Sequence, residues 1–213
     1  MTKRKKNFVG AVKIFFLCSV IMLPLAGCVT EATRVGADTQ IDLTGRWNDS
    51  DVRIVCDTLV AECLNAAGVD RAISQFTASH GGDLPTVIVG NFANTSSEHI
   101  DTSIISKTME TIIINSGKLE FVAGSDIREG IRDERVDQAY NASEATAAAI
   151  GNEAAATFML TGSVKSSVEK SGTTTVRAYF VDAQLTNIET NRIIWQGQNA
   201  DIKKVFKQAT ARF

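Results

Sequence analysis

The chain has 213 residues, of which 44% are hydrophobic, with 22 lysines and arginines against 24 aspartates and glutamates. This hydrophobic fraction is ordinary for a globular protein. The first 27 residues hold five basic and no acidic residues, so the remainder has 17 basic against 24 acidic residues and a net charge of −7. That balance argues against a protein whose partner is nucleic acid or another polyanion.

The N-terminus has the pattern of a secretory signal. Four basic residues at positions 3–6 precede an apolar run over residues 14–26, which is shorter than the roughly 20 residues of a membrane-spanning helix. The run ends in Leu25-Ala26-Gly27-Cys28, which resembles the lipobox of bacterial lipoproteins. We therefore predict a signal peptide over residues 1–27 and lipid on Cys28. The alternative is an ordinary signal peptide with an incidental cysteine.

Residues 28–43 are polar and rich in small side chains, without an apolar period. We predict a flexible, lipidated tether here and one globular domain over residues 44–213. Fully extended, the tether reaches roughly 50 Å at about 3.4 Å per residue.

The first half of the domain predicts two helices and two strands. A turn over residues 44–51 leads into a helix that Asp49, Ser50 or Asp51 caps and that ends near Gly68. Residues 84–92 form the first strand. Thr95 and Glu98 have the spacing of a capping box for a second helix, which residues 115–117 terminate. Residues 119–122 form a short strand.

The second half predicts helices followed by a strand meander. Residues 125–135 form a short helix and a charged loop, and residues 143–151 form an alanine-rich helix. Strands follow over residues 157–164, 172–185 and 193–197, the first two joined by a polar turn. Ile202, Val205, Phe206 and Ala209 repeat at helical spacing, which predicts a final helix.

This order of elements predicts the fold class. Strand–helix–strand units favour parallel pairing, and consecutive strands favour an antiparallel meander. We therefore expect a single small α/β (α+β) domain, in which helices pack on a mixed sheet of about four to five strands.

Two cysteines remain in the predicted domain. Cys56 and Cys63 lie seven residues apart in one predicted helix, so their Cα atoms would be about 10 Å apart. This exceeds the roughly 7 Å limit for a disulfide. We predict two free thiols on an apolar helix face.

No catalytic or metal-binding motif is present in the sequence. His80 and His99 lie in no recognisable triad or zinc-binding spacing, so we expect no enzyme, no cofactor and no metal. Asp49 and Asp51 are the one carboxylate pair considered as acid and base on glycans. The spacing before a helix favours a capping role instead.

Two segments are candidate contact surfaces. Arg46, Trp47, Asn48 and Asp49 have the composition of an interaction hot spot, although Trp47 fits equally well as a residue that fixes this loop to the core. The predicted C-terminal helix carries Lys203, Lys204, Lys207 and Arg212. These side chains would contact anionic head groups or a partner, or form a solvated face.

Four segments together resemble the LpoB-type penicillin-binding-protein activator lipoproteins. They are residues 44–49 (TGRWND), 115–122 (NSGKLEFV), 148–163 (AAIGNEAAATFMLTGS) and 190–197 (TNRIIWQG). The resemblance implies a domain similar to the N-terminal domain of TolB. It also implies an outer-membrane lipoprotein that faces the periplasm and stimulates a bifunctional peptidoglycan synthase by direct contact. Val29 after the lipidated cysteine agrees with outer-membrane sorting.

One departure from the family pattern and two alternative functions stay open. Enterobacterial members have a long proline-rich tether, whereas residues 29–43 contain no proline. One alternative function is that of a lipoprotein similar to the curli-secretion channel or another envelope scaffold. The other alternative is a glycan-acting enzyme. The chain lacks a long apolar-outward hairpin for the former and a site signature for the latter.

Overall fold

A computed structural model describes residues 32–36, 39–141 and 153–208 of the chain. The chain divides into two compact units, Met1–Ala37 and Asp38–Phe213, and all of the described helices and strands lie in the second. The predicted signal peptide, Cys28 and the predicted alanine-rich helix over residues 143–151 lie outside the described residues.

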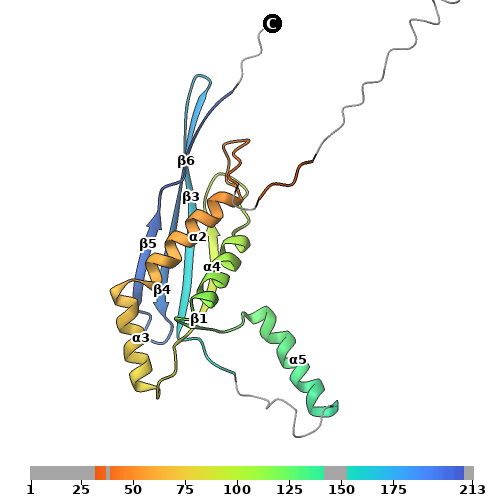
Figure 1. Ribbon diagram of the computed structural model, residues 1–213, viewed down its shortest axis with the longest axis vertical. Coiled ribbons are helices and arrows are strands. Elements are labelled where there is room, and N and C mark those ends of the chain that lie inside the picture. The colour runs from red at the N-terminus through yellow and green to blue at the C-terminus, as the bar shows by residue number, and fades with distance from the viewer. Residues whose placement is uncertain (1–31, 37–38, 142–152, 209–213) are drawn as a thin grey trace, which may run out of the picture. The chain divides into compact units, whose positions relative to one another are not determined.

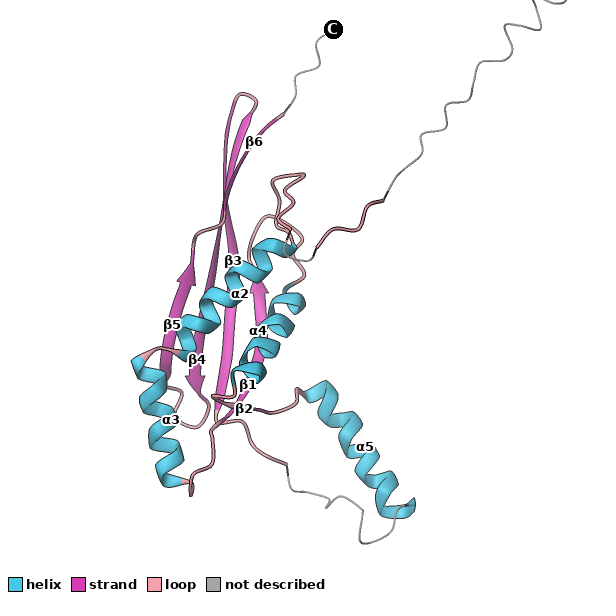
Figure 2. Cartoon of the chain, in the orientation of Figure 1, coloured by secondary structure: helices cyan, strands magenta, loops and turns pink. Residues whose placement is uncertain are grey.

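The second unit is a mixed sheet with helices packed on it (Figures 1 and 2). Its elements are α2 (Asp49–Leu64), α3 (Ala67–Ser79), β1 (Thr86–Asn94), α4 (Thr102–Ser116), β2 (Glu120–Phe121), α5 (Ser125–Asn141), β3 (Phe158–Ser171), β4 (Thr174–Asn187), β5 (Ile193–Asn199) and β6 (Lys203–Lys207). The strand order is β2-β1-β3-β4-β5, and β6 pairs with β4. β1 is parallel to β2 and β3, and the other pairs are antiparallel. The predicted fold class is confirmed, with six strands in the sheet.

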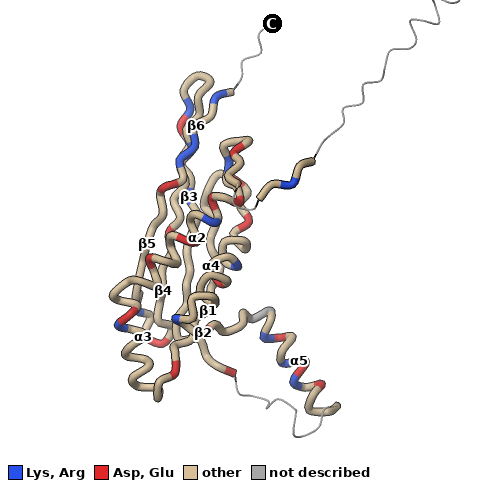
Figure 3. The backbone as a smooth tube through the Cα atoms, viewed as in Figure 1, with Lys and Arg blue, Asp and Glu red and all other residues tan. Residues whose placement is uncertain are grey.

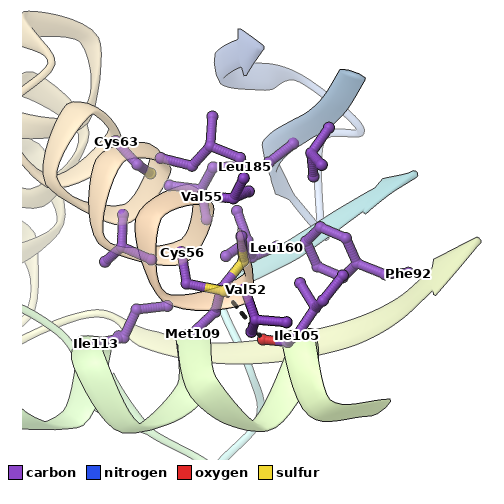
Figure 4. Packing of buried hydrophobic residues seen from close by; sticks show 14 of the residues in the cluster. Val52, Val55, Cys56, Cys63, Phe92, Ile105, Met109, Ile113, Leu160 and Leu185 are labelled. Carbon is purple, nitrogen blue, oxygen red and sulfur yellow. Dashed lines mark hydrogen bonds between the residues drawn. The ribbon is translucent and has the colours of Figure 1, made fainter. Parts of the chain in front are cut away.

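The core lies between the sheet and the helices α2 and α4, which also pack on each other. Strand β4 has one face in this core, because its side chains alternate between buried and partly exposed positions. The buried face of β4 carries Tyr179, Val181, Ala183 and Leu185. Figure 4 shows how residues of α2 and α4 meet in this core.

The predicted free cysteines are confirmed. Cys56 and Cys63 are both free and buried in α2, and the Sγ of Cys56 lies 3.8 Å from the carbonyl oxygen of Ile105 (Figure 4). Burial raises the pKa of each thiol to about 12. Both side chains therefore act as small apolar core residues.

The predicted C-terminal helix is wrong, because residues 203–207 form strand β6. In this strand Lys204 and Phe206 turn inward, whereas Lys203, Val205 and Lys207 are exposed. β5 ends opposite Val181, so the backbone of β4 from Thr174 to Ala178 is free to pair with β6. Pairing with β4 thus overrides a weak helical period.

Three further boundaries differ from the prediction. α2 ends at Leu64, and a separate helix, α3, follows it; Gly68 lies inside α3 rather than after α2. α5 covers 17 residues instead of a short helix and a loop. β3 and β4 each cover 14 residues and form a longer hairpin than predicted, with Gly172 in its turn at φ 56°. Among the described residues, no helix has the length and hydrophobicity to cross a membrane.

Candidate partner-binding face

Trp47 is fixed to the domain. Its ring meets the Tyr179 ring edge-on, with 5.2 Å between centroids, and it packs against the buried core. Its backbone N–H donates to Glu98 Oε2 over 3.3 Å. Of the two roles considered for Trp47, these contacts support fixation of the loop; the contact with a partner stays a prediction.

Asn48 caps α2, so the prediction of Asp49, Ser50 or Asp51 as the cap is wrong. The Asn48 side chain accepts a hydrogen bond from the backbone N–H of Asp51, and the Asp51 carboxylate accepts one from that of Asn48. This reciprocal pair is a capping box, in which Asp51 takes the position usually held by Glu or Gln. Asp49 is exposed and forms an ion pair of 2.9 Å with Arg53. Because Asp51 is buried and Asp49 is not, the two carboxylates do not form an open acid–base pair.

Lys204 joins β6 to the start of the domain. Its Nζ lies 2.5 Å from Asp42 and 2.6 Å from Asp51, and it donates to the carbonyl oxygen of Arg46 over 2.9 Å. The hydrogen bond from Lys204 lowers the pKa of Asp42. Burial raises the pKa of Asp51 against the opposing effect of Lys204. Lys204 is thus a structural cation, whereas Lys203 and Lys207 are exposed; Arg212 lies outside the described residues.

Glu98 links the segment before α4 to strand β4 and does not cap a helix. It forms an ion pair of 2.6 Å with Arg177 and accepts a hydrogen bond from the Tyr179 hydroxyl over 2.9 Å. Burial, with the nearby Glu98 carboxylate, raises the pKa of Tyr179. α4 instead begins after Asp101, whose side chain accepts from the N–H of Ser103. The predicted capping box of Thr95 and Glu98 is therefore wrong, because a long-range ion pair takes Glu98.

Arg46 is the member of the 46–49 segment that presents a free charge. It is exposed, and its guanidinium has no ion pair among the described residues. Asn48 and Asp49 are occupied by the cap and by Arg53. Of these four residues, Arg46 is thus the one whose charged group is exposed and unpaired among the described residues; its contact with a partner stays a prediction.

A groove between α2 and α4 lies next to this segment along α2. It is open to solvent, has a volume of about 560 Å³ and is lined by Arg53 and Asp57 of α2 and by Ile104 and Lys107 of α4, among others. A smaller hollow of about 240 Å³ shares Arg53 and Asp57 and adds Ile54. Ile104 is 53% exposed and Ile54 is 39% exposed. We call Arg53, Ile54, Asp57, Ile104 and Lys107 the docking face.

Apolar side chains within a charged rim characterise protein-binding surfaces. Charges of both signs lie along α2 and α4 in Figure 3. The isoleucines of α4 are the sequence signal of this surface. α4 has more isoleucines than its buried stripe of Ile105, Met109 and Ile113 requires, so Ile104 is left outside.

The two histidines lie at a helix end and on the surface. His80 stacks on Phe76 with 3.8 Å between ring centroids at the end of α3, and His99 is exposed. Within residues 32–36, 39–141 and 153–208, no cluster of three His, Cys, Asp or Glu could hold a metal ion. The described residues thus form a small α/β domain with a partly apolar groove between α2 and α4.

Comparison of the sequence with protein families shows to which family this domain belongs. The family model described as "Peptidoglycan-synthase activator LpoB" matches residues 52–200, and the chain belongs to this family. The family consists of envelope lipoproteins that regulate peptidoglycan synthesis and are activators rather than enzymes. No curated protein matches the chain.

Several solved structures are similar to the chain. The C-terminal domain of LpoB from Escherichia coli is 18% identical with a TM-score of 0.44, covering 70% of this chain and 97% of that one. The corresponding domain from Salmonella enterica is 16% identical with a TM-score of 0.40 and covers the same shares. Lipoprotein GNA1162 from Neisseria meningitidis is 10% identical with a TM-score of 0.35, covering 60% of this chain and 87% of that chain.

Proposed function

We propose that this protein is an outer-membrane lipoprotein, anchored through Cys28 and facing the periplasm, that binds a bifunctional penicillin-binding protein. In this proposal it stimulates both glycan polymerisation and peptide cross-linking by that synthase. The observation that carries the proposal is membership of the LpoB family over residues 52–200. The lipobox resemblance and Val29 support the anchor and the membrane.

The docking face supports a mechanism that requires no catalysis by this chain. A binding protein activates an enzyme when it binds the active conformation more tightly than the inactive one. Ile54 and Ile104 offer apolar surface for burial, and the exposed carboxylate of Asp57, which has no ion pair among the described residues, offers a charge that sets the orientation. Arg53 and Lys107 flank it in ion pairs with Asp49 and Glu110. The exposed guanidinium of Arg46 is proposed as an additional contact.

The test uses the full lipidated chain in detergent with the bifunctional synthase of the same organism. We expect direct binding and faster glycan polymerisation. Ile104→Glu places a charge in the docking face and should weaken binding and stimulation at least about ten-fold. Val168→Glu is the matched control, because Val168 is similarly exposed (44%) on the β3–β4 hairpin; it should leave both unchanged.

The outcomes separate the function from the face. If the wild-type chain neither binds nor stimulates the synthase, the activator proposal is wrong. Capture of secretion components from solubilised host membranes would then favour the channel-type alternative. If Ile104→Glu and Val168→Glu both behave as wild type, the activator proposal stands and the docking face lies elsewhere, with Arg46→Glu as the next variant.

A further inference from the structure

A second cleft lies where α3 meets the start of β3, the end of β4 and the start of β5. It has a volume of about 540 Å³, and its lining includes Arg71, Gln75 and Phe76 of α3 with Asn187, Thr190 and Arg192. This volume falls in the range of small-molecule sites. None of these residues belongs to the docking face.

The walls of the cleft are held in place by backbone geometry. A Cβ atom on Gly68 would lie 2.8 Å from the carbonyl oxygen of Ile194, so α3 lies directly against β5. On the opposite wall, the Asn187 side chain accepts hydrogen bonds from the backbone N–H and the hydroxyl of Thr190. The N–H of Asn187 donates to the carbonyl oxygen of Arg192. The turn that carries Arg192 is therefore fixed before any ligand binds.

The charge of the cleft is opposite to that of the protein. The chain after residue 27 has a net charge of −7, yet the lining holds two arginines and no aspartate or glutamate. Arg53, Arg132 and Arg177 are each paired with a carboxylate. Among the described residues, the guanidinium groups of Arg71 and Arg192 have no such partner. An acidic protein thus keeps two unpaired cations in one cleft.

We propose that this cleft binds a small organic oxyanion, with Arg71 and Arg192 as the groups that hold its carboxylate or phosphate. A guanidinium presents a planar fork of donors that matches either group. Gln75 adds an amide, and Phe76 adds an apolar wall for the rest of the ligand. The binding requires neither the docking face nor a synthase, so it stands apart from the proposed function.

Calorimetric titration of the full chain in detergent tests the proposal. One arm uses N-acetyl-D-alanyl-D-alanine as a carboxylate probe, and the other uses phenyl phosphate as a phosphate probe. We expect saturable binding in at least one arm, and the arm that binds identifies the source of the oxyanion. Arg71→Gln and Arg192→Gln should each weaken that binding about ten-fold, the loss of one charged hydrogen-bonding group.

Lys170→Gln is the matched control, because it removes one positive charge from an exposed position on β3 and should leave the affinity unchanged. The proposal is overturned if neither probe binds, if either arginine variant binds as wild type, or if Lys170→Gln weakens binding equally. Thermal unfolding of each variant at the wild-type temperature confirms that a loss of binding reflects the cleft.

Discussion

At the residue scale, Lys204 holds the start of the domain to β6. Its side chain is 9% exposed and that of Asp51 is 2% exposed, so Lys204→Met leaves a buried carboxylate without its cation. Loss of one partner from a buried pair costs about 3 kcal/mol, and we expect a reduction of this order in the free energy of unfolding at pH 7. Urea denaturation measures it. Lys203→Met, on the exposed face of the same strand, should change stability by less than about 0.5 kcal/mol.

The same variant has a predicted pH dependence. Burial raises the pKa of Asp51 above its unfolded value of 3.8, so its charged form is the one that burial penalises. As the pH falls through the folded pKa, Asp51 takes up a proton and this penalty disappears. The difference between Lys204→Met and wild type should therefore be smaller at pH 4 than at pH 7. A difference that grows on acidification would contradict this account of Asp51.

The two buried thiols should be unreactive in the native protein. With their pKa raised to about 12, only about one thiol in ten thousand is ionised at pH 8. We expect iodoacetamide at pH 8 to leave Cys56 and Cys63 unmodified in the folded chain and to alkylate both in urea. Peptide mass spectrometry distinguishes the two states. Fast labelling of either cysteine without urea would show that α2 opens locally.

At the element scale, sequence periodicity predicted the helices and strands that local patterns determine. It failed where a residue distant in the sequence determines the structure. The parallel and antiparallel parts of the sheet follow from the order of the elements, and α4 ends at Gly117 in the left-handed conformation, as its sequence indicates. β6 was not predictable, because five residues fit either period and only β4 selects the strand. Glu98 likewise has capping-box spacing, yet its ion pair with Arg177 lies 79 positions away in the sequence.

Two helical glycines should respond in opposite directions to the same substitution. Alanine normally stabilises a helix interior relative to glycine by about 0.5–1 kcal/mol. Gly130→Ala in α5 meets no atom within 4 Å and should show that gain. Gly68→Ala in α3 places its methyl group against the Ile194 carbonyl oxygen, and overpacking of about 1–3 kcal/mol should outweigh the gain. Thermal unfolding checks both signs; stabilisation by Gly68→Ala would mean that α3 moves freely from β5.

At the scale of the whole molecule, the candidate site combines a predicted segment with an unpredicted surface. The composition of residues 46–49 pointed to the start of α2, and the structure shows that Trp47 and Asn48 serve the fold there. The groove between α2 and α4 depends on how two helices, which begin 53 positions apart in the sequence, pack together. No spacing within one helix reveals such a surface, whereas the exposed Ile104 shows it once the helices are placed.

The reach of the predicted tether gives a prediction that involves membrane, tether and domain together. Because Lys204 holds Asp42, the free part of the predicted tether would be shorter than residues 28–43, and the predicted lipid on Cys28 would lie at most 13 residues (29–41) from the domain. Deletion of residues 30–37 shortens the extended reach by roughly 27 Å. If the proposed activator must reach its synthase from the outer membrane, this variant should fail to stimulate peptidoglycan synthesis in cells, measured by incorporation of a labelled precursor. In detergent, where no distance has to be spanned, it should bind and stimulate the purified synthase as wild type.

Unchanged stimulation in cells would show that the synthase meets the domain close to the anchoring membrane. Loss of stimulation in detergent would show that residues 30–37 contribute contacts rather than length.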